Sequence, residues 1–507
     1  MVSDGGPQWT LAVGCAGVAL IVGSMVAFNT ALGDLAVATS ASQTQLNWIV
    51  DGYTVVLACL LLPAGAIGDR HGRRAALLAG LAVFSVASTA PAIFDTPSQI
   101  IAGRMLAGAG AAFVMPATLS LLSRAYPRAQ RAKAIGVWAA VAGCAGVAGL
   151  VGSGVVLTFW DWKAICWALG STGVLVLVAA LTISPPSDAD APAVDWLGAL
   201  LIACAVATLV LGLLEAPNRG WASPITIGCL AGGLLAAAGF GWAETRQRQP
   251  LLDLRWFNDR SVAASAVAIT ALFAATFGFF YLGMQYAQLM MGYSALQAAA
   301  AFTPFMVPVV TLSVLSWRYA PRLGVGRVLV AGMVVIAAGF LFMLWLQPGS
   351  SYLHLMIPTV IIGAGIGLST APATSAIMGS LRDERQGVAS AINDTARELG
   401  AAVGIAVSGS VLAQRYTHQV TPHLSTLPQP VRDQAADTVG KALRIAESMG
   451  AQGVPTAETA ERAFVSAIQS SAVVSAVMAA AAALLIAAIV FVPDATDAGS
   501  PPVGAHK

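Results

Sequence analysis

Between two long apolar runs, the chain reads Gly65-Ala66-Ile67-Gly68-Asp69-Arg70-His71-Gly72-Arg73-Arg74. This connector is rich in glycine and dense in charge, although the sequence on either side is almost free of charged residues. If both flanking runs cross a membrane, so short a link has to lie at the membrane face. The connector therefore bears on the architecture of the chain, on its orientation and on its function.

The composition predicts a membrane protein built from helices. Of the 507 residues, 57% are hydrophobic and 10% are charged, and the mean hydropathy is +0.77. Soluble domains carry about 25% charged residues. A transmembrane helix needs about 20 apolar residues to cross a hydrocarbon core about 30 Å thick. Only helices and closed barrels satisfy the backbone inside lipid, and long runs without polar alternation favour helices. We therefore expect an all-α polytopic membrane protein.

Several classes of function receive no support from the sequence. The net charge is +2 and the basic residues are scattered over loops, so no nucleic-acid-binding patch is expected. No P-loop, dinucleotide fingerprint, nucleophile–base set or histidine pair with metal-ligand spacing is found. The six cysteines lie inside apolar runs without CxxC spacing, which is typical of small packing residues. We expect neither an enzyme nor a bound metal or cofactor.

Fourteen apolar segments are long enough to span a membrane. The first begins near Thr10, is too long for a signal-peptide core and lacks a basic leading segment, so it is interpreted as a span. The segments lie near residues 10–33, 46–67, 75–95, 99–122, 134–157, 164–184, 197–215, 224–243, 261–289, 297–317, 327–347, 353–379, 387–412 and 465–492.

Basic residues gather in one alternating set of loops. This set holds 16 of the 26 Lys and Arg, whereas the short loops of the opposite set hold only Lys163 and Arg219. Such an excess marks the cytoplasmic side, and an even number of spans then places both termini in the cytoplasm. The 16 residues are Arg70, Arg73, Arg74, Arg124, Arg128, Arg131, Lys133, Arg246, Arg248, Arg255, Arg260, Arg318, Arg322, Arg327, Arg382 and Arg385.

Two polar segments fit this pattern less well. The loop 185–195 should be cytoplasmic, yet it carries Asp188, Asp190 and Asp195 and no basic residue. The stretch 413–464 should lie outside, where a long loop is only weakly governed by the charge rule. We expect an amphipathic external helix near 431–449.

An internal repeat divides the chain into two halves. Gly108-Ala109-Gly110 followed by Pro116-Ala117-Thr118 is matched by Gly363-Ala364-Gly365 followed by Pro372-Ala373-Thr374. The stretch 322–327 is interpreted as a degenerate copy of the connector at 65–74. Many secondary transporters consist of repeated halves. The prediction is an N-terminal six-helix bundle at 1–184, an inserted two-helix segment with linkers at 185–260, a C-terminal six-helix bundle at 261–492 that includes the external loop 413–464, and a cytoplasmic tail at 493–507.

Several motifs match those of one transporter family in order. The connector at 65–74 matches a loop between helices 2 and 3. Arg104, Gly108, Gly110 and Ala112 match an R-x-x-Q-G-x-G-A-A motif of helix 4, with Ala107 where Gln is usual. Further matches are Trp48-Ile49-Val50-Asp51-Gly52-Tyr53, Asp195-Trp196-Leu197-Gly198, Pro250-Leu251-Leu252 and Asn393-Asp394-Thr395-Ala396-Arg397-Glu398-Leu399-Gly400. Over nearly its whole length the chain resembles the major facilitator superfamily, specifically its fourteen-helix drug:proton antiporters. The resemblance implies the major facilitator fold, with two six-helix bundles and an inserted helix pair.

Three positions depart from the family pattern. Ser24 occupies the place of a helix-1 acid, and Gly33 stands where that pattern has Pro. The stretch 149–154 lacks the Pro of the helix-5 antiporter motif, so that motif alone does not argue for antiport. Because Ser24 stands in place of the acid, we expect transport of divalent cations to be less favoured. Divalent dyes should therefore not be transported better than monovalent ones.

Three of the 24 acidic residues lie clearly inside candidate spans: Asp51, Asp394 and Glu398. A carboxylate inside a membrane is costly and usually faces an aqueous cavity where it has a function. Because burial disfavours the ionised form, such a group can take up and release protons. Asp51 is placed about one turn from the outer end of its span and Glu398 close to mid-membrane. We expect all three to couple protons or bind cations, with Arg104 keeping a neighbouring carboxylate ionised.

A packing role in a salt bridge is the alternative for each of these acids. Arg104 lies at a depth similar to that of Asp51 and is its candidate partner. Arg397 follows Asp394 by three residues and therefore lies on the same helix face. The sequence leaves both interpretations open.

Further residues are candidates for the substrate cavity and for a gate. Aromatic faces attract cations, although aromatic residues also gather at membrane interfaces. By resemblance, Asp69 and Arg73 form a latch between helices at the inner face, and the dipole at the end of the helix that carries Asp69 is expected to reinforce it. The cavity candidates are Asn29, Trp48, Tyr53, Tyr281, Tyr286 and Asn393, and the gate candidates are Gly65, Asp69, Arg70, Gly72, Arg73 and Arg74.

The resemblance implies a secondary active transporter of the cytoplasmic membrane. It would export lipophilic, cationic drugs or toxic compounds in exchange for protons by alternating access, driven by the proton gradient and without a cofactor. The expected partners are these small molecules, protons and membrane lipid, without nucleic acid, and the chain is expected to be a monomer. An exporter of an endogenous metabolite, antibiotic or lipid is the alternative on the same fold. A membrane enzyme or a channel would need a catalytic constellation or a repeated pore loop, and neither is found.

Overall fold

The computed structural model describes residues 6–94, 96–183, 194–247, 250–424 and 427–491. Within these ranges every regular element is helical. Fourteen stretches are long and apolar enough to cross a membrane, which confirms the predicted number. Asp188, Asp190 and Arg248 lie outside the described residues.

The transmembrane helices follow the predicted segments closely, and short helices connect some of them. The first six spans are α1 (Pro7–Ala27), α3 (Gln43–His71), α4 (Arg73–Thr89), α5 (Pro97–Ala125), α6 (Arg128–Phe159) and α7 (Lys163–Ala180), with α2 (Leu32–Thr39) between α1 and α3. The next two are α8 (Trp196–Arg219) and α9 (Pro224–Glu244). The last six are α10 (Arg260–Leu289), α11 with α12 (Ala295–Ala301 and Met306–Leu323), α13 (Val325–Phe342), α14 (Tyr352–Ser380), α15 (Gln386–Val420) and α18 (Val454–Phe491).

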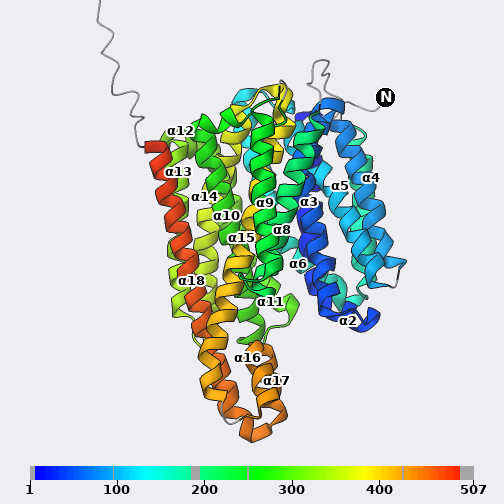
Figure 1. Cartoon of the computed structure of the whole chain (residues 1–507). Helices are drawn as coiled ribbons and strands as arrows, with labels where there is room; N and C mark the ends of the chain where they lie inside the picture. Colours follow the sequence, from blue (N-terminus) through cyan, green and yellow to red (C-terminus); the bar gives the residue numbers. More distant parts are fainter. Residues whose placement is uncertain (1–5, 95, 184–193, 248–249, 425–426, 492–507) are drawn as a thin grey trace, which may run out of the picture.

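The spans form two six-helix bundles with an added helix pair. In the first bundle α5 packs on α3 and α4, and α1 packs on α6; in the second α10 packs on α15, and α13 packs on α14 and α18. Helices α8 and α9 pack on each other. In Figure 1, α1 begins and α18 ends at the same end of the molecule, as an even number of spans requires.

Helices α15 and α18 extend beyond the apolar segments from which they were predicted. Their polar ends project from the molecule at the bottom of Figure 1 and carry α16 (Gln429–Asp437) and α17 (Val439–Ser448). The single helix expected near 431–449 is thus two helices, because the chain is extended at Thr438, whose side chain caps α17. Hydropathy underestimates the lengths of α15 and α18 because the end of a helix that lies outside the lipid can be polar. The hydroxyl of Tyr416 donates to the carbonyl of Ala435 at 3.0 Å and joins α15 to α16.

Matching glycine contacts occur in both bundles. A Cβ added at Gly110 would lie 2.7 Å from the carbonyl oxygen of Gly80, and one added at Gly365 would lie 2.6 Å from that of Gly332. Helices α5 and α4 therefore approach each other in the same way as α14 and α13. The turns after α3 and α12 also match, since Gly72 and Gly324 have φ values of 102° and 84°. These contacts agree with the internal repeat predicted from the sequence.

The added helix α8 lies against both bundles. Its Val206 and Val210 share an apolar cluster with Val55 of α3 and Ala402 of α15. At the end of the molecule where α1 begins and α18 ends, which is called the inner end below, Asp195 accepts the N–H groups of Leu197 and Gly198 at 3.1 and 3.0 Å. An aspartate at a helix N-terminus satisfies free N–H groups and the helix dipole. This local role explains why an acid stands on the side rich in arginine.

Candidate functional site

The connector at 65–74 forms the inner end of α3, a one-residue turn at Gly72 and the start of α4. The φ of 102° at Gly72 lies in a region that glycine adopts without a Cβ penalty. Across this turn, Nε of Arg73 donates to Oδ1 of Asp69 at 2.8 Å. The two side chains are 1% and 5% exposed, so the pair lies inside the protein and is shielded from solvent.

Asp69 also contacts the second bundle. Its Oδ1 accepts the N–H of Gly387 at 2.9 Å and its Oδ2 accepts the N–H of Val388 at 3.0 Å. Because α15 begins at Gln386, these are first-turn N–H groups that lack a partner in their own helix. The dipole that favours Asp69 is therefore the positive N-terminus of α15. The sequence interpretation assigned this role to the end of α3, but a helix C-terminus is negative and does not favour a carboxylate.

Arg73 and two more arginines at this end of the molecule make further contacts. Nη2 of Arg73 donates to the carbonyl of Asp383 at 2.7 Å, and Nη1 of Arg131 lies 2.9 Å from Oδ1 of Asp383. Nη2 of Arg74 donates to the carbonyl of Leu181 at 2.6 Å. The inner ends of α3, α4 and α6 are thereby tied to the start of α15.

Gly65 allows α3 and α15 to touch at this end. A Cβ added at Gly65 would lie 2.6 Å from the carbonyl oxygen of Gly387 and 2.8 Å from Cβ of Ala391. Real Cβ atoms essentially never approach backbone so closely. The closed inner face shown by the structure therefore depends on the missing side chain.

The Gly65→Ala variant is expected to disfavour closure of the inner face. Overpacking of this kind costs roughly 1–3 kcal/mol, and only the closed arrangement is affected. Distances between spin labels at the inner ends of α3 and α15 should show a larger open population. Gly68→Ala is the matched control, because its Cβ would only meet Cβ of Ala76 at 3.4 Å. An equal shift in both variants would contradict the role of the Gly65 contact.

The middle of α15 carries a buried polar network. Oγ1 of Thr374 in α14 donates to Oδ1 of Asn393 at 2.9 Å, and Nδ2 of Asn393 donates to Oδ1 of Asp394 at 3.0 Å. Oγ of Ser390 donates to Oδ2 of Asp394 at 3.5 Å. Both Asn393 and Asp394 are fully buried. In this conformation Asn393 therefore positions Asp394 and does not line an open cavity.

Arg397 and Glu398 lie one turn further along α15. They follow the start of the helix by 11 and 12 residues, which is about 17 Å along the axis and near the middle of a 30 Å core. Their side chains are 3% and 7% exposed. The Cζ atom of Arg397 lies 4.9 Å from the ring centroid of Trp138 and 4.8 Å from that of Phe273. Among the described residues, Nε and Nη2 of Arg397 and Oε2 of Glu398 have no hydrogen-bond partner.

The predicted partnership of Asp394 with Arg397 is not a direct contact among the described residues. Arg397 lies within electrostatic reach of Asp394 and Glu398, but its guanidinium lies over the two rings instead. Residues three apart share a helix face, yet a long side chain can extend away from its neighbour toward another helix. Trp138 belongs to α6 of the first bundle and Phe273 to α10 of the second.

The predicted pairing of Arg104 with Asp51 is wrong. Nε of Arg104 donates to the carbonyl of Ile49 at 3.1 Å, and Nη1 and Nη2 donate to Oγ and the carbonyl of Ser24 at 3.1 and 3.2 Å. Its Cζ lies 4.5 Å from the ring centroid of Phe28 and 4.3 Å from that of Tyr53. Neutral acceptors and aromatic faces therefore hold this buried cation. Ser24, noted in the sequence as a replaced acid, supplies two of the acceptors.

Asp51 instead faces the added helix α8. It lies within electrostatic reach of Glu215, which itself pairs with Arg219. Because α3 begins at Gln43, Asp51 lies about 12 Å from the outer end of its helix, nearer two turns than the one predicted. Its side chain is half-buried.

The remaining cavity candidates differ in their burial and in their contacts. Tyr53 is fully buried and its hydroxyl donates to the carbonyl of Ile21 at 3.0 Å; Tyr286 is fully buried and donates to the carbonyl of Gln347 at 2.7 Å. Asn29 is exposed, and Trp48 and Tyr281 are half-buried. Both buried tyrosines thus use their hydroxyl groups in packing. Tyr53 lies within electrostatic reach of Glu398.

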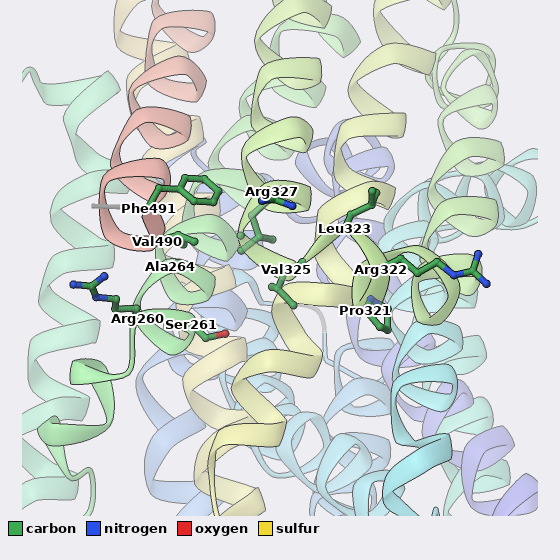
Figure 2. A pocket seen from close by; sticks show the side chains of 13 residues that line it. Arg260, Ser261, Ala264, Pro321, Arg322, Leu323, Val325, Arg327, Val490 and Phe491 are labelled. Carbon is green, nitrogen blue, oxygen red and sulfur yellow. The ribbon is translucent and has the colours of Figure 1, made fainter. Parts of the chain in front are cut away.

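A basic cavity of about 640 Å³ opens at the inner end of the second bundle. Figure 2 shows Arg260, Arg322 and Arg327 around it, with Val490 and Phe491 of α18 on one side. The cavity lies at the predicted copy of the first connector. This copy has the glycine turn at Gly324 but carries no acid in the place of Asp69. A latch to a helix N-terminus is therefore found only in the first bundle among the described residues.

Sequence reasoning missed Trp138 and Phe273, the two rings at Arg397. A tryptophan ten residues inside α6, far from the interfaces where aromatic residues gather, was the available signal for Trp138. Asp383 was also missed, because nothing local distinguishes it from other loop acids. In the described part of the chain, no group of three His, Cys, Asp or Glu side chains could hold a metal ion.

Comparison with known proteins gives consistent results. A sequence model of the Major Facilitator Superfamily matches residues 14–405. Multidrug resistance protein Stp of Mycobacterium tuberculosis is 31% identical over 407 residues, which cover 80% of this chain and 76% of that protein. The tetracenomycin C resistance and export protein of Streptomyces glaucescens is 31% identical, with coverage of 74% and 70%. Multidrug efflux pump LfrA of Mycolicibacterium smegmatis is 29% identical, with coverage of 86% and 87%.

Solved structures show the same fold at low sequence identity. The human organic anion transporter MFSD10 superposes with a TM-score of 0.61 at 12% identity, and the alignment covers 95% of this chain and 99% of that one. The proton:xylose symporter XylE superposes with a TM-score of 0.60 at 13% identity, with 96% coverage of both chains.

Proposed function

Because the chain belongs to the major facilitator superfamily, a family of transporters and not of enzymes, we propose that it exports lipophilic, cationic drugs or toxic compounds in exchange for protons. The relatives named for multidrug resistance and efflux support export of small molecules. The observation that carries the proposal is the pair of buried carboxylates at mid-depth of α15, Asp394 and Glu398.

The exchange follows from the chemistry of these carboxylates. An ionised Glu398 attracts a cation, and a protonated one does not, so a proton and a cationic substrate compete for the same group. Asp51 is the second carboxylate proposed to take part, at the contact between α3 and α8. Arg104, held by neutral acceptors, supplies a fixed positive charge in the first bundle that disfavours a second cation there. The proton gradient drives the cycle without a cofactor.

The inner-face contacts fit alternating access. The structure has the inner ends of α3 and α15 in contact through Gly65 and Asp69, so a substrate entering from inside requires these contacts to separate. We place the protein in the cytoplasmic membrane as a monomer, with membrane lipid around the bundles. Both termini lie in the cytoplasm, on the side that carries the arginine-rich connectors.

Everted membrane vesicles test the proposed function. With an inside-acid pH gradient, vesicles that contain the protein should accumulate an ethidium-like dye, and a protonophore should release it. Vesicles without the protein are the control. Accumulation that survives the protonophore would contradict proton coupling, and absence of accumulation for a panel of cationic dyes would contradict the cargo class.

Export of an endogenous antibiotic is the second candidate. It is favoured by relatives named for resistance to, and export of, a single antibiotic, such as tetracenomycin C. A strain that lacks the protein should then retain a cell-made compound inside the cell. The dye assay would show little activity in that case.

A further inference from the structure

Arg397 is a buried cation, and two of its donor nitrogens are unpaired among the described residues. The side chain is 3% exposed, and Nε and Nη2 have no partner among the described residues. Leaving a buried charged donor unpaired costs more than an ordinary hydrogen bond contributes. Each buried polar group without a partner in a native structure calls for an explanation, such as a ligand.

The two aromatic rings near Arg397 account for its position but not for its donors. Trp138 and Phe273 stabilise the cation through their faces, at 4.9 and 4.8 Å from Cζ. The guanidinium N–H groups form a planar fork that matches two oxygens of a carboxylate, and the rings offer this fork no carboxylate or carbonyl oxygen. The ring contacts therefore orient the fork without using its donors.

An unpaired acid lies beside this unpaired base. Oε2 of Glu398, the next residue of α15, is buried and has no partner among the described residues. Glu398 and Arg397 are within electrostatic reach of each other, yet they do not satisfy each other's free atoms. The site thus presents one free acceptor and one free donor fork at the same depth of the membrane.

An apolar wall adjoins the charged pair. Phe273 stacks on Phe277 one turn along α10, with ring centroids 6.4 Å apart, and both rings are half-buried. A flat lipophilic body can lie against such rings. The apolar wall, the donor fork and the free carboxylate together complement a ligand that has an aromatic body and two opposite charges.

We propose that the central site takes zwitterionic lipophilic compounds, with Arg397 binding their carboxylate and Glu398 their cationic group. This inference rests on the proposed export function and narrows its substrate class. Trp138 comes from the first bundle and Arg397 from the second, so the ring contact forms between the two bundles. Separation of the bundles on the inner side would uncover the guanidinium for a carboxylate that enters from the cytoplasm.

A matched pair of dyes tests this inference. A rhodamine with a free benzoic acid and its methyl ester share the same cationic xanthene and differ only in the carboxylate. Binding is measured by fluorescence anisotropy on the purified protein, and transport is measured in everted vesicles. Arg397→Gln is expected to weaken binding of the acid by about tenfold or more, since a hydrogen bond to a charged group contributes roughly 1.5–3 kcal/mol, while the ester is hardly affected. Arg397→Lys should give an intermediate loss, because it keeps the charge and loses the fork.

The controls separate this inference from the proposed function. Arg415→Gln changes an exposed arginine of the same helix and should alter neither dye, and retained ester binding shows that each variant is folded. The carboxylate site would be overturned if Arg397→Gln weakened binding of the acid and of the ester equally. It would also be overturned if both Arg397 variants bound the two dyes as tightly as the parent protein does. If the binding difference holds but neither dye is transported, proton-driven export fails and the carboxylate site stands.

Discussion

Vesicles that contain the Glu398→Gln variant are expected to lose gradient-driven accumulation of cationic dyes. Two unit charges 4 Å apart attract each other by about 4 kcal/mol at an effective dielectric constant of 20, which corresponds to roughly a thousandfold in affinity. The glutamine has the same size and a similar hydrogen-bonding capacity, but it neither ionises nor takes up a proton. Both the attraction for the cation and the competition with the proton are therefore removed.

Two variants make this test specific. Glu398→Asp retains an ionisable group on a shorter side chain and should keep part of the activity. Glu447→Gln changes an exposed acid of α17 outside the bundles and should leave accumulation unchanged. Dye accumulation in Glu398→Gln at the level of the parent protein would remove Glu398 from the proposed exchange and leave Asp51 or Asp394 as the coupling carboxylate.

The Asp69→Asn variant is expected to open the inner face. Asp69 accepts hydrogen bonds from Arg73, Gly387 and Val388, and its carboxylate is the charge partner of a buried arginine. Removing one member of a buried ion pair costs roughly 3–5 kcal/mol, which is two to four powers of ten in the ratio of closed to open molecules. Spin-label distances across the inner ends of α3 and α15 should lengthen, and transport should fall with them.

A neighbouring acid provides the matched control. Asp383 pairs with Arg131 through side chains that are 35% and 21% exposed, and exposed pairs of this kind contribute at most about 1 kcal/mol. Asp383→Asn keeps the backbone carbonyl that Arg73 uses. It should therefore shift the inner distances far less than Asp69→Asn. Similar shifts in both variants would mean that the closed inner face depends on the total charge there and not on the hydrogen bonds from Asp69 to the start of α15.

Much of the fold was predictable because the signals are local. Lipid requires long apolar helices whatever their neighbours are, so the fourteen spans and most of their ends follow from hydropathy alone. The errors came where helices leave the lipid, at the outer ends of α15 and α18. There the sequence is polar, and only caps such as Thr438 separate one helix from the next.

The sequence predicted which acids of α15 lie buried inside a span, but not the partners of the charged residues. Asp394 and Glu398 were found because acids are rare inside spans. Arg104 was matched with Asp51 by depth, but the structure surrounds it with Ser24, Ile49 and two rings. Depth along a helix is given by residue number, whereas the direction of a long side chain depends on which helix packs beside it.

The sequence by itself determined that this protein is a bundle of fourteen membrane helices whose loop arginines gather at one end, because burial of apolar surface acts on each segment separately and the arginines stand in alternate loops. The sequence predicted a ten-residue connector at 65–74, whereas the structure continues α3 to His71 and turns at Gly72 alone. Only the tertiary structure decided that Asp69 caps a helix 318 residues further along the chain and that Arg397 lies on Trp138 of the other bundle. Free N–H groups at a helix start bond to whatever acceptor is nearest in space, and the face of a guanidinium packs on whatever ring is nearest. These groups were established by the packing of the two bundles and not by the order of the residues.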